Sequence, residues 1–352
     1  MNKRLLIAMF VVIPGVSHAQ SSVTLFGTIG GGVRWVDGVK GGNEVGFNNN
    51  IIDGNEFGLK GMEDLGGGLK AIFMLDSSFA SGTGAAKTPG LLFSQAAYVG
   101  LAGNFGRLTL GRQLNAAEDL GVILDPSGAN AQSMAIAPEV VYGANFFTLD
   151  SRFNNTIKYM DRYGGLRFGA SYSPGGVAGN TRAGTNFSAA ALYQFQTALG
   201  GLTYEKTYSP TAAQWAETFE AGGMLQLGPA RLYLSYTTLA VTGIAVGSPN
   251  RRDKIPTGGI VYQITPSLQL TAAVYDDMAN NLSNVHSADG HKLTTYAIAE
   301  YFLSKRTEVY VEWDRNGFTG AYKSDPTNLA ALSLRPGASA TTGVSIGLMT
   351  QF

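Results

Sequence analysis

The chain has 352 residues, and its 25 basic and 25 acidic residues give a formal net charge of zero. This balance excludes the basic excess that is typical of nucleic-acid-binding proteins. Charged residues make up only 14% of the chain, against about 25% in soluble domains, and the absence of cysteine excludes disulfides. The composition favours one large closed sheet, with a surface that need not face water, over several soluble domains.

The N-terminus has the features of a secretory signal peptide in the usual order. A basic start is followed by an apolar run over residues 5–12 and by small residues up to Ala19. We expect cleavage after Ala19, which assigns 1–19 to the signal and 20–352 to a single barrel domain. Cleavage would leave 23 basic residues against 25 acidic ones. The alternative, a membrane anchor, needs about 20 apolar residues, more than this run contains.

The rest of the chain contains no apolar run long enough for a membrane helix. A chain that crosses lipid without helices must form a closed β-barrel, because otherwise backbone groups stay unpaired. Alternation with period two begins at once: one parity holds Leu25, Ile29 and Val33, and the other holds Thr24, Thr28 and Arg34. Similar alternation follows at 56–60, 156–159 and 231–236. Such strands place apolar side chains toward lipid and polar ones toward a lumen.

Turn signals divide the chain into tight periplasmic turns and longer external loops, which alternate in outer-membrane barrels. Tight turns are predicted at residues 65–68, 104–106, 163–165, 198–201, 228–229, 265–266 and 304–305. Longer loops are predicted at residues 37–51, 80–91, 113–152, 174–184, 209–215, 241–253, 278–290 and 317–338. These connections predict an all-β fold, a 16-stranded antiparallel transmembrane β-barrel, which is wide enough for an aqueous channel.

Three segments resemble the porins of β-proteobacteria in sequence and order. They are residues 55–69 (NEFGLKGMEDLGGGL), 97–113 (AYVGLAGNFGRLTLGRQ) and 155–172. The opening SVTLFG at 22–27 and the terminal strand that ends in Phe352 agree with the same family. The likeness to Gram-negative general diffusion porins covers most of the chain after the predicted signal.

The resemblance implies a homotrimer in the outer membrane, surrounded by lipids and lipopolysaccharide, that passes ions and small hydrophilic solutes through a water-filled pore. It also implies that the third external loop folds back into the pore, and that the outer-membrane insertion machinery recognises the terminal aromatic residue. Residues 113–152 are an independent sign of a functional loop, because loops of about forty residues are rare in compact domains. No cofactor is expected.

Charges that face the lumen can set a selectivity barrier. The predicted wall charges, chosen by parity and family position, are Arg34, Glu56, Lys60, Arg112 and Lys158. Arg112 shares the parity of Leu110, so it faces the pore only if a bulge or strand end lies near Gly111. Glu56 stands where the family usually has arginine, which argues against strong anion selectivity.

Acidic residues of the long loop are predicted to lie opposite this wall. They are Glu118, Asp119, Asp125 and Glu139. No lysine or arginine lies between Gln113 and Ser151, and such separation of charge would set a transverse field across a pore. The alternative for each acid is a local role in capping a turn.

Other motifs have structural explanations. The sequence GVSIG at 343–347 fits the nucleophile pattern of hydrolases, but the residues that follow are too few for the helix that this motif requires. No cysteine lies near His286 or His291, so no metal site is predicted. Asp276 and Asp277 face opposite sides of a strand, so they cannot flank one substrate.

The glycine runs at 30–32 and 66–68 lead into no helix, so they indicate close strand packing and tight turns rather than phosphate binding. A barrel enzyme would need a histidine near a credible serine, and none is present. A substrate-specific channel or an adhesin stays open as an alternative, because Tyr142, Phe146 and Phe147 could form an aromatic track in the long loop. The sequence favours a general diffusion porin, not an enzyme.

Overall fold

The computed structural model describes residues 21–128 and 144–352. Its strands are β1 (Ser22–Val39), β2 (Gly42–Asn48), β3 (Glu56–Gly66), β4 (Leu69–Ser78), β5 (Ala96–Gly103), β6 (Gly106–Leu114), β7 (Arg152–Tyr163), β8 (Leu166–Ser173), β9 (Asn186–Gln194), β10 (Ala198–Tyr208), β11 (Trp215–Leu227), β12 (Ala230–Val241), β13 (Arg251–Thr265), β14 (Leu268–Asn280), β15 (Gly290–Phe302), β16 (Thr307–Phe318) and β17 (Ala340–Gln351). Its short helices are α1 (Ala116–Gly121), η1 (Val122–Leu124), η3 (Leu282–Asn284), η4 (Gly320–Lys323) and α2 (Pro326–Ala331). None of these helices is long and apolar enough to cross a membrane. The predicted signal at 1–19 lies outside the described residues.

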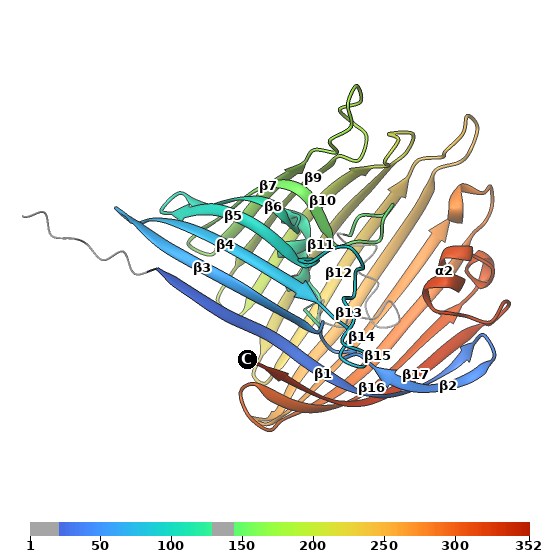
Figure 1. Cartoon of the computed structure of the whole chain (residues 1–352). Coiled ribbons are helices and arrows are strands. Elements are labelled where there is room, and N and C mark those ends of the chain that lie inside the picture. The colour runs from blue at the N-terminus through green and yellow to red at the C-terminus, as the bar shows by residue number, and fades with distance from the viewer. Residues whose placement is uncertain (1–20, 129–143) are drawn as a thin grey trace, which may run out of the picture.

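The strands of the described residues form one antiparallel sheet that closes where β1 pairs with β17 (Figure 1). β1 is long enough to pair with β3 over residues 22–28 and with β2 over residues 32–39. β2 and β3 therefore share one position in the wall. The result is the predicted closed barrel of sixteen antiparallel positions, in which β2 pairs with β1 alone.

The two faces of the wall differ in polarity over much of the barrel. On β12, Leu234 is 72% exposed and its neighbour Ser235 only 6%, and on β17, Ile346 is 60% exposed and Ser345 only 1%. This follows from the period of two, because successive side chains of a strand point to opposite faces. The outer apolar face suits the hydrocarbon core of a bilayer, and the polar face lines the lumen.

Six of the seven predicted tight turns lie where expected between consecutive strands. The prediction at 198–201 is wrong, because the turn lies at 195–197 and β10 begins at Ala198. Gly201 lies within β10. Its lack of a side chain allows close packing there, because a Cβ would lie 2.5 Å from Cγ of Leu192 on β9. At the β3–β4 turn, Gly66, Gly67 and Gly68 have positive φ, which glycine adopts at little cost.

The long connections are partly more regular than predicted. Most of the predicted loop at 37–51 is strand, because β1 continues to Val39 and β2 runs back along it. The predicted loops at 241–253 and 278–290 are shortened, since β13 begins at Arg251 and β14 continues to Asn280. In each case the strands extend further toward the loops than predicted, so the wall of the barrel is taller there.

Apolar residues also gather on the lumen side in two clusters. In the first, Ile51 and Ile52 pack with residues of β11 to β16, including Tyr310. In the second, Leu120 and Leu124 pack against Leu192 and Leu199 of β9 and β10. Segments that leave the wall therefore pack against its inner face.

Candidate pore constriction

The described part of the long loop begins with helix α1, which is fixed to the polar face of the wall. Asn115 caps the helix, with its Oδ1 accepting the Glu118 N–H at 2.8 Å. The Ala116 N–H donates to the Ser188 Oγ at 2.9 Å and to the Ser171 Oγ at 3.1 Å. Ser171 and Ser188 belong to β8 and β9. Two serine hydroxyls of the wall thus hold the start of the segment in place.

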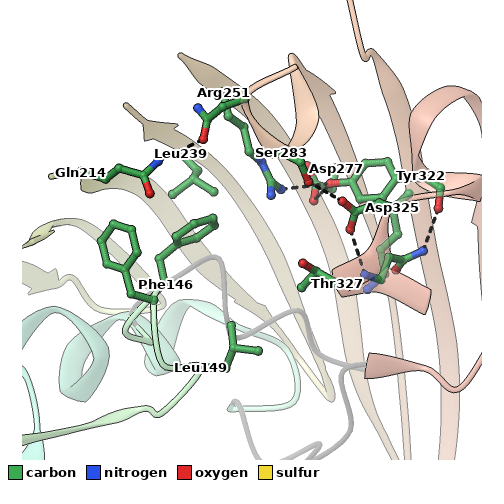
Figure 2. A pocket seen from close by; sticks show the side chains of 14 residues that line it. Phe146, Leu149, Gln214, Leu239, Arg251, Asp277, Ser283, Tyr322, Asp325 and Thr327 are labelled. Atoms are coloured by element: carbon green, nitrogen blue, oxygen red, sulfur yellow. Dashed lines mark hydrogen bonds between the residues drawn. The ribbon is translucent and has the colours of Figure 1, made fainter. Parts of the chain in front are cut away.

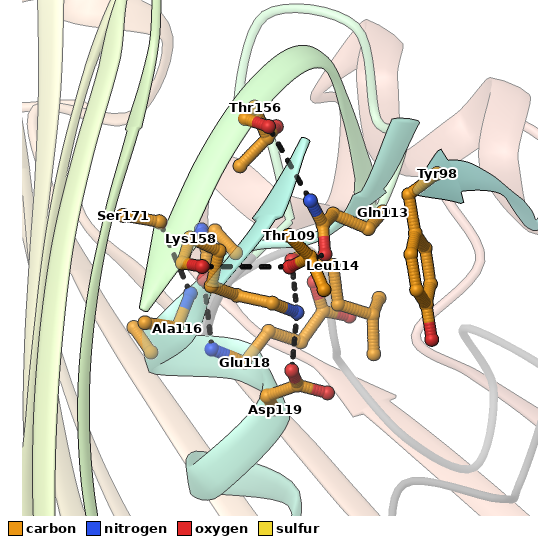
Figure 3. Close-up of polar contacts among 12 residues, drawn as sticks. Tyr98, Thr109, Gln113, Leu114, Ala116, Glu118, Asp119, Thr156, Lys158 and Ser171 are labelled. Carbon is orange, nitrogen blue, oxygen red and sulfur yellow. Dashed lines mark hydrogen bonds and ion pairs between the residues drawn. The ribbon is translucent and has the colours of Figure 1, made fainter. Parts of the chain in front are cut away.

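Lys158 of β7 connects the wall to this helix (Figure 3). Its Nζ donates to the Leu114 carbonyl at 2.8 Å and forms an ion pair with Asp119. The Lys158 side chain is almost fully buried, whereas that of Asp119 is a quarter exposed. The structure therefore brings together two of the predicted charges, one from the wall and one from the long loop.

The other end of the described segment contacts a distant part of the wall. The Tyr275 hydroxyl of β14 donates to the Asp125 Oδ2 at 2.6 Å. The Tyr275 ring stacks on Tyr296 of β15, with 6.1 Å between ring centroids. Asp125 also accepts the Ser127 N–H at 2.8 Å, so it caps a local turn and binds the wall at once. Glu139 lies outside the described residues.

Arg34 is paired on its own side of the barrel and not with the long loop. Its guanidinium lies 3.1 Å from Glu312 Oε2 and 2.7 Å from Asp314 Oδ2, both on β16. It also donates to the Ser345 Oγ at 3.0 Å. Gly343 leaves room for this guanidinium, because a Cβ there would lie 2.1 Å from it.

Glu56 and Lys60 both lie on β3 with the lumen-facing parity. Glu56 is half-buried and stands opposite Thr28 and Ser78 in the ladders of β1 and β4. Lys60 is exposed, and its Nζ lies 5.1 Å from the centroid of the Phe26 ring. The two charges do not contact residues 115–128.

Arg112 directly follows a β-bulge, the irregularity that its side chain needs in order to face the lumen. The β6–β7 register shifts between Gly111 and Gln113, and Gly111 has φ +137°. The Arg112 side chain is 9% exposed and pairs with Asp150 at 2.7 Å. It donates further to the Ser94 carbonyl and the Asn154 Oδ1, both at 2.9 Å. Arg112 therefore fastens the end of the long loop to the wall.

Several lumen-side groups are not among the predicted site residues. They are Arg231, Tyr233, Tyr275, Glu300, Glu312 and Asp314. Alternation offered a signal for the two β16 acids, because they share a parity opposite to Val311 and Trp313. The same signal is weak on β14 and β15, where tyrosine and isoleucine occupy the lumen side.

A hollow of about 360 Å³ lies at the end of the barrel that carries the long loops. Figure 2 shows Phe146 and Leu149 on one side of it and Tyr322 and Asp325 on the other. The Tyr322 hydroxyl donates to the Asp277 Oδ2 at 2.5 Å. Burial, and then the nearby Asp277 charge, raise the pKa of Tyr322 far above its usual value, so the phenol stays protonated.

The serine of the GVSIG sequence and the adjacent acids Asp276 and Asp277 all have structural contacts. Ser345 is buried on β17 and accepts a hydrogen bond from Arg34. Asp277 is buried, whereas Asp276 is partly exposed and its Oδ1 lies 3.1 Å from the His291 Nδ1, so the adjacent acids face opposite sides as expected. Within residues 21–128 and 144–352, no group of three or more histidine and acidic side chains could hold a metal.

Comparison with known proteins decides the family. The sequence profile described as Gram-negative porin matches residues 6–321, which is most of the chain. The chain is a Gram-negative porin. This porin is accordingly a protein of the outer membrane, which it crosses with the strands of its barrel.

Three similar proteins illustrate the relationship. An outer membrane porin protein of Bordetella pertussis is 36% identical over 191 residues, which are 49% of this chain and 48% of that protein. Outer membrane porin protein 32 of Delftia acidovorans is 27% identical over 377 residues, with 100% of both chains covered. The solved structure of an anion-selective porin from Comamonas acidovorans has a TM-score of 0.79 at 22% identity, covering 95% of this chain and 100% of that one. This last likeness supports the barrel fold alone.

Proposed function

We propose that this porin is a general diffusion channel, in which ions and small hydrophilic solutes cross the outer membrane passively through a lumen narrowed by residues 115–128. The supporting observation is that one segment binds the polar face in two distant places. It binds Ser188 of β9 at its start and Tyr275 of β14 near its end. We expect a segment held in this way to narrow the lumen, with the Lys158–Asp119 pair at the narrowing.

The proposal is tested by recording single channels of the purified porin in planar bilayers. A general diffusion channel should conduct in proportion to salt concentration, and its reversal potential in a salt gradient should report only weak selectivity. Flux of sugars and amino acids into proteoliposomes should fall with solute size and should not saturate. Saturating flux of one solute class would contradict the proposal.

A substrate-specific channel is the second candidate, and the hollow beside Phe146 favours it. Phe146 and Phe147 meet edge to face, with 5.5 Å between centroids, and the Arg251 guanidinium lies 5.6 Å from the Phe146 ring centroid. An aromatic surface beside a cation could bind one face of a solute. If so, a bound solute should block the current in wild-type channels, and Phe146→Ala should remove the block.

We propose that transport involves no catalytic step. The serine of the GVSIG sequence supports this, because Ser345 lies inside a strand and its hydroxyl is bound by Arg34. Incubation of the porin with chromogenic esters and with peptide substrates should release no product above the rate of the Ser345→Ala variant.

We propose that three chains assemble into a homotrimer with three separate pores. The outer face supplies the surface for this contact, with Leu234, Val311 and Ile346 each at least half exposed. The porin should run as an oligomer in mild detergent until it is heated. Sedimentation of the unheated porin as a monomer would contradict the trimer.

We also propose that residues 1–19 are a cleaved signal. N-terminal sequencing of the porin isolated from outer membranes should begin at Gln20. A sequence that begins at Met1 would contradict cleavage.

A further inference from the structure

The wall position that β2 and β3 share is interrupted by a segment that is separate from the long loop. β2 ends at Asn48 opposite Gly32, and β3 begins at Glu56 opposite Thr28. Three residues of β1 thus face seven residues, 49–55, on the other side of the ladder. Figure 1 shows β2 and β3 following one another along β1. Residues 49–55, called the inner bend here, must leave the wall.

The inner bend leaves the wall on the lumen side. A Cβ on Gly30 would lie 2.8 Å from the Asn50 Cγ, and Gly30 shares its parity with Arg34, which faces the lumen. The Gly30 N–H, which has no ladder partner at the interruption, donates to the Asn55 Oδ1 at 2.7 Å. The glycine at position 30 is therefore needed so that the inner bend can cover β1 from within.

The tip of the inner bend is apolar and buried. Ile51 and Ile52 are each 7% exposed and belong to a cluster with Tyr296, Ile298 and Tyr310. These partners lie on the lumen face of β15 and β16 and not beside β3 in the wall. The tip is therefore held in place by packing.

Hydrogen bonds to the next loop fix the base of the inner bend. Asn55 donates to the Ser81 Oγ and to the Asn49 carbonyl, both at 2.9 Å. The Ser81 hydroxyl donates in turn to the Gly30 carbonyl at 2.6 Å, and the Gly82 N–H donates to the Asn49 Oδ1 at 2.9 Å. This set of bonds makes the bend a fixed part of the lumen.

The inner bend and the long loop face one space. A hollow of about 410 Å³ is lined by Ile52 from the bend and by Val122 and Ile123 from the long loop. Arg231 and Glu300 complete its lining from the wall. Both segments therefore bound the same part of the lumen, from different directions.

We propose that the inner bend is a second constriction element, which sets the size limit of the pore together with residues 115–128. This inference rests on the proposed diffusion function. The charge at the narrowing comes from Asp119 of the long loop and Lys158 of the wall, whereas Ile51 and Ile52 of the bend bring apolar bulk. Asp53, the charged residue of the bend, lines a separate hollow with Arg34 and Lys87. The bend should therefore govern the size of the solutes admitted more than the sign of their charge.

The absence of native cysteine allows a direct experiment. Ile52→Cys is introduced into the full chain, reconstituted in planar bilayers and treated with methanethiosulfonate reagents, with modification confirmed by mass spectrometry. A neutral bulky reagent should cause a stepwise loss of conductance, and cationic and anionic reagents should move the reversal potential in opposite directions. Val33→Cys is the matched control, because Val33 is 53% exposed on the outer face; its modification should leave the current unchanged.

A second pair of variants covers the case in which the buried cysteine does not react. Ile52→Ala should admit larger sugars into proteoliposomes than the wild type, and Ile52→Trp should exclude sugars that the wild type admits. Unchanged conductance after confirmed modification, or an unchanged size limit in folded Ile52→Ala and Ile52→Trp, would overturn the role of the inner bend. Failure of the diffusion proposal would look different, because the wild-type porin itself would then show saturating flux.

Discussion

At the scale of single residues, several lumen-side charges of this porin are held in pairs with opposite charges on other elements. Arg34 binds Glu312 and Asp314, and Lys158 binds Asp119. A passing ion therefore experiences the net charge of each group of paired residues and not the full charge of one member. Removal of one member should expose the charge of the other, which makes these positions sensitive to substitution.

Lys158→Met should shift selectivity toward cations, because Asp119 then loses its partner. One unit charge acts on an ion 4 Å away with about 1 kcal/mol in water, so the permeability ratio should change by up to about fivefold. Reversal potentials in a salt gradient measure this ratio. Lys206→Met is the control, because Lys206 has the outward parity on β10 and pairs with Glu217. Shifts of equal size in both variants would show that Lys158 does not act at the narrowing.

Glu56→Arg should move selectivity toward anions, because it changes the local wall charge by two units. Fixed charges act weakly on ions beyond a Debye length of about 8 Å at physiological salt. The same substitution at Glu44, an exposed residue of β2 near the hairpin that joins β1 to β2, is the matched control. If Glu44→Arg moves the reversal potential as far as Glu56→Arg, Glu56 does not line the narrow part of the pore.

At the scale of elements, interruptions of regular strands position the functional groups. The bulge at Gly111 turns Arg112 away from the parity of Leu110, and the inner bend interrupts the wall between β2 and β3. Both devices depend on glycine, since Gly111 has positive φ and Gly30 gives space to Asn50. A β-bulge re-aims side chains in this way near functional sites.

Gly111→Ala should lower the free energy of unfolding by about 1–3 kcal/mol, the usual cost of backbone strain at a non-glycine residue. An alanine Cβ would lie 2.1 Å from the Ala97 carbonyl oxygen. Urea unfolding of the refolded porin, followed by tryptophan fluorescence, measures the change. Gly258→Ala is the control, because a Cβ there meets nothing within 4 Å. Equal stability of the two variants would refute the strain argument.

At the scale of the whole molecule, the barrel closes through its two end strands. The Phe352 N–H donates to the Gly27 carbonyl at 3.0 Å, and the Gly27 N–H donates to the Phe352 carbonyl at 3.2 Å. The Phe352 ring covers Gly27, where a Cβ would lie 2.5 Å from the ring. The last residue thus combines a role in closure with the predicted role in recognition by the insertion machinery.

Phe352→Leu separates these two roles, because the backbone bonds to Gly27 remain while the aromatic ring is lost. The free energy of unfolding of the refolded variant should change by less than about 1.5 kcal/mol, as for other exchanges of similar volume. The amount of porin inserted in the outer membrane of cells should fall. Normal amounts in the membrane, measured by surface labelling, would contradict the recognition role.

Much of the architecture is readable from the sequence, because its signals are local. Alternation with period two assigns most side chains to a face, and six of seven tight turns are marked by their own residues. For Arg112, parity requires either a bulge or a strand end near Gly111 if the side chain faces the lumen, and the structure has the bulge. The turn at 195–197 is predicted in the wrong place, because glycine is typical both of turns and of strands that pack closely together.

The sequence by itself thus determined the barrel and the number of wall positions. Only the tertiary structure decided which charges meet. Arg34 and Glu312 are 278 residues apart and come together solely because closure places β1 beside β17 and β16. The inner bend could not be recognised either, because its short asparagine-rich sequence is the same whether it faces water outside the barrel or packs across the lumen. Its position depends on contacts with Tyr310 and Ile298, which lie far away in sequence and are brought near by the barrel alone.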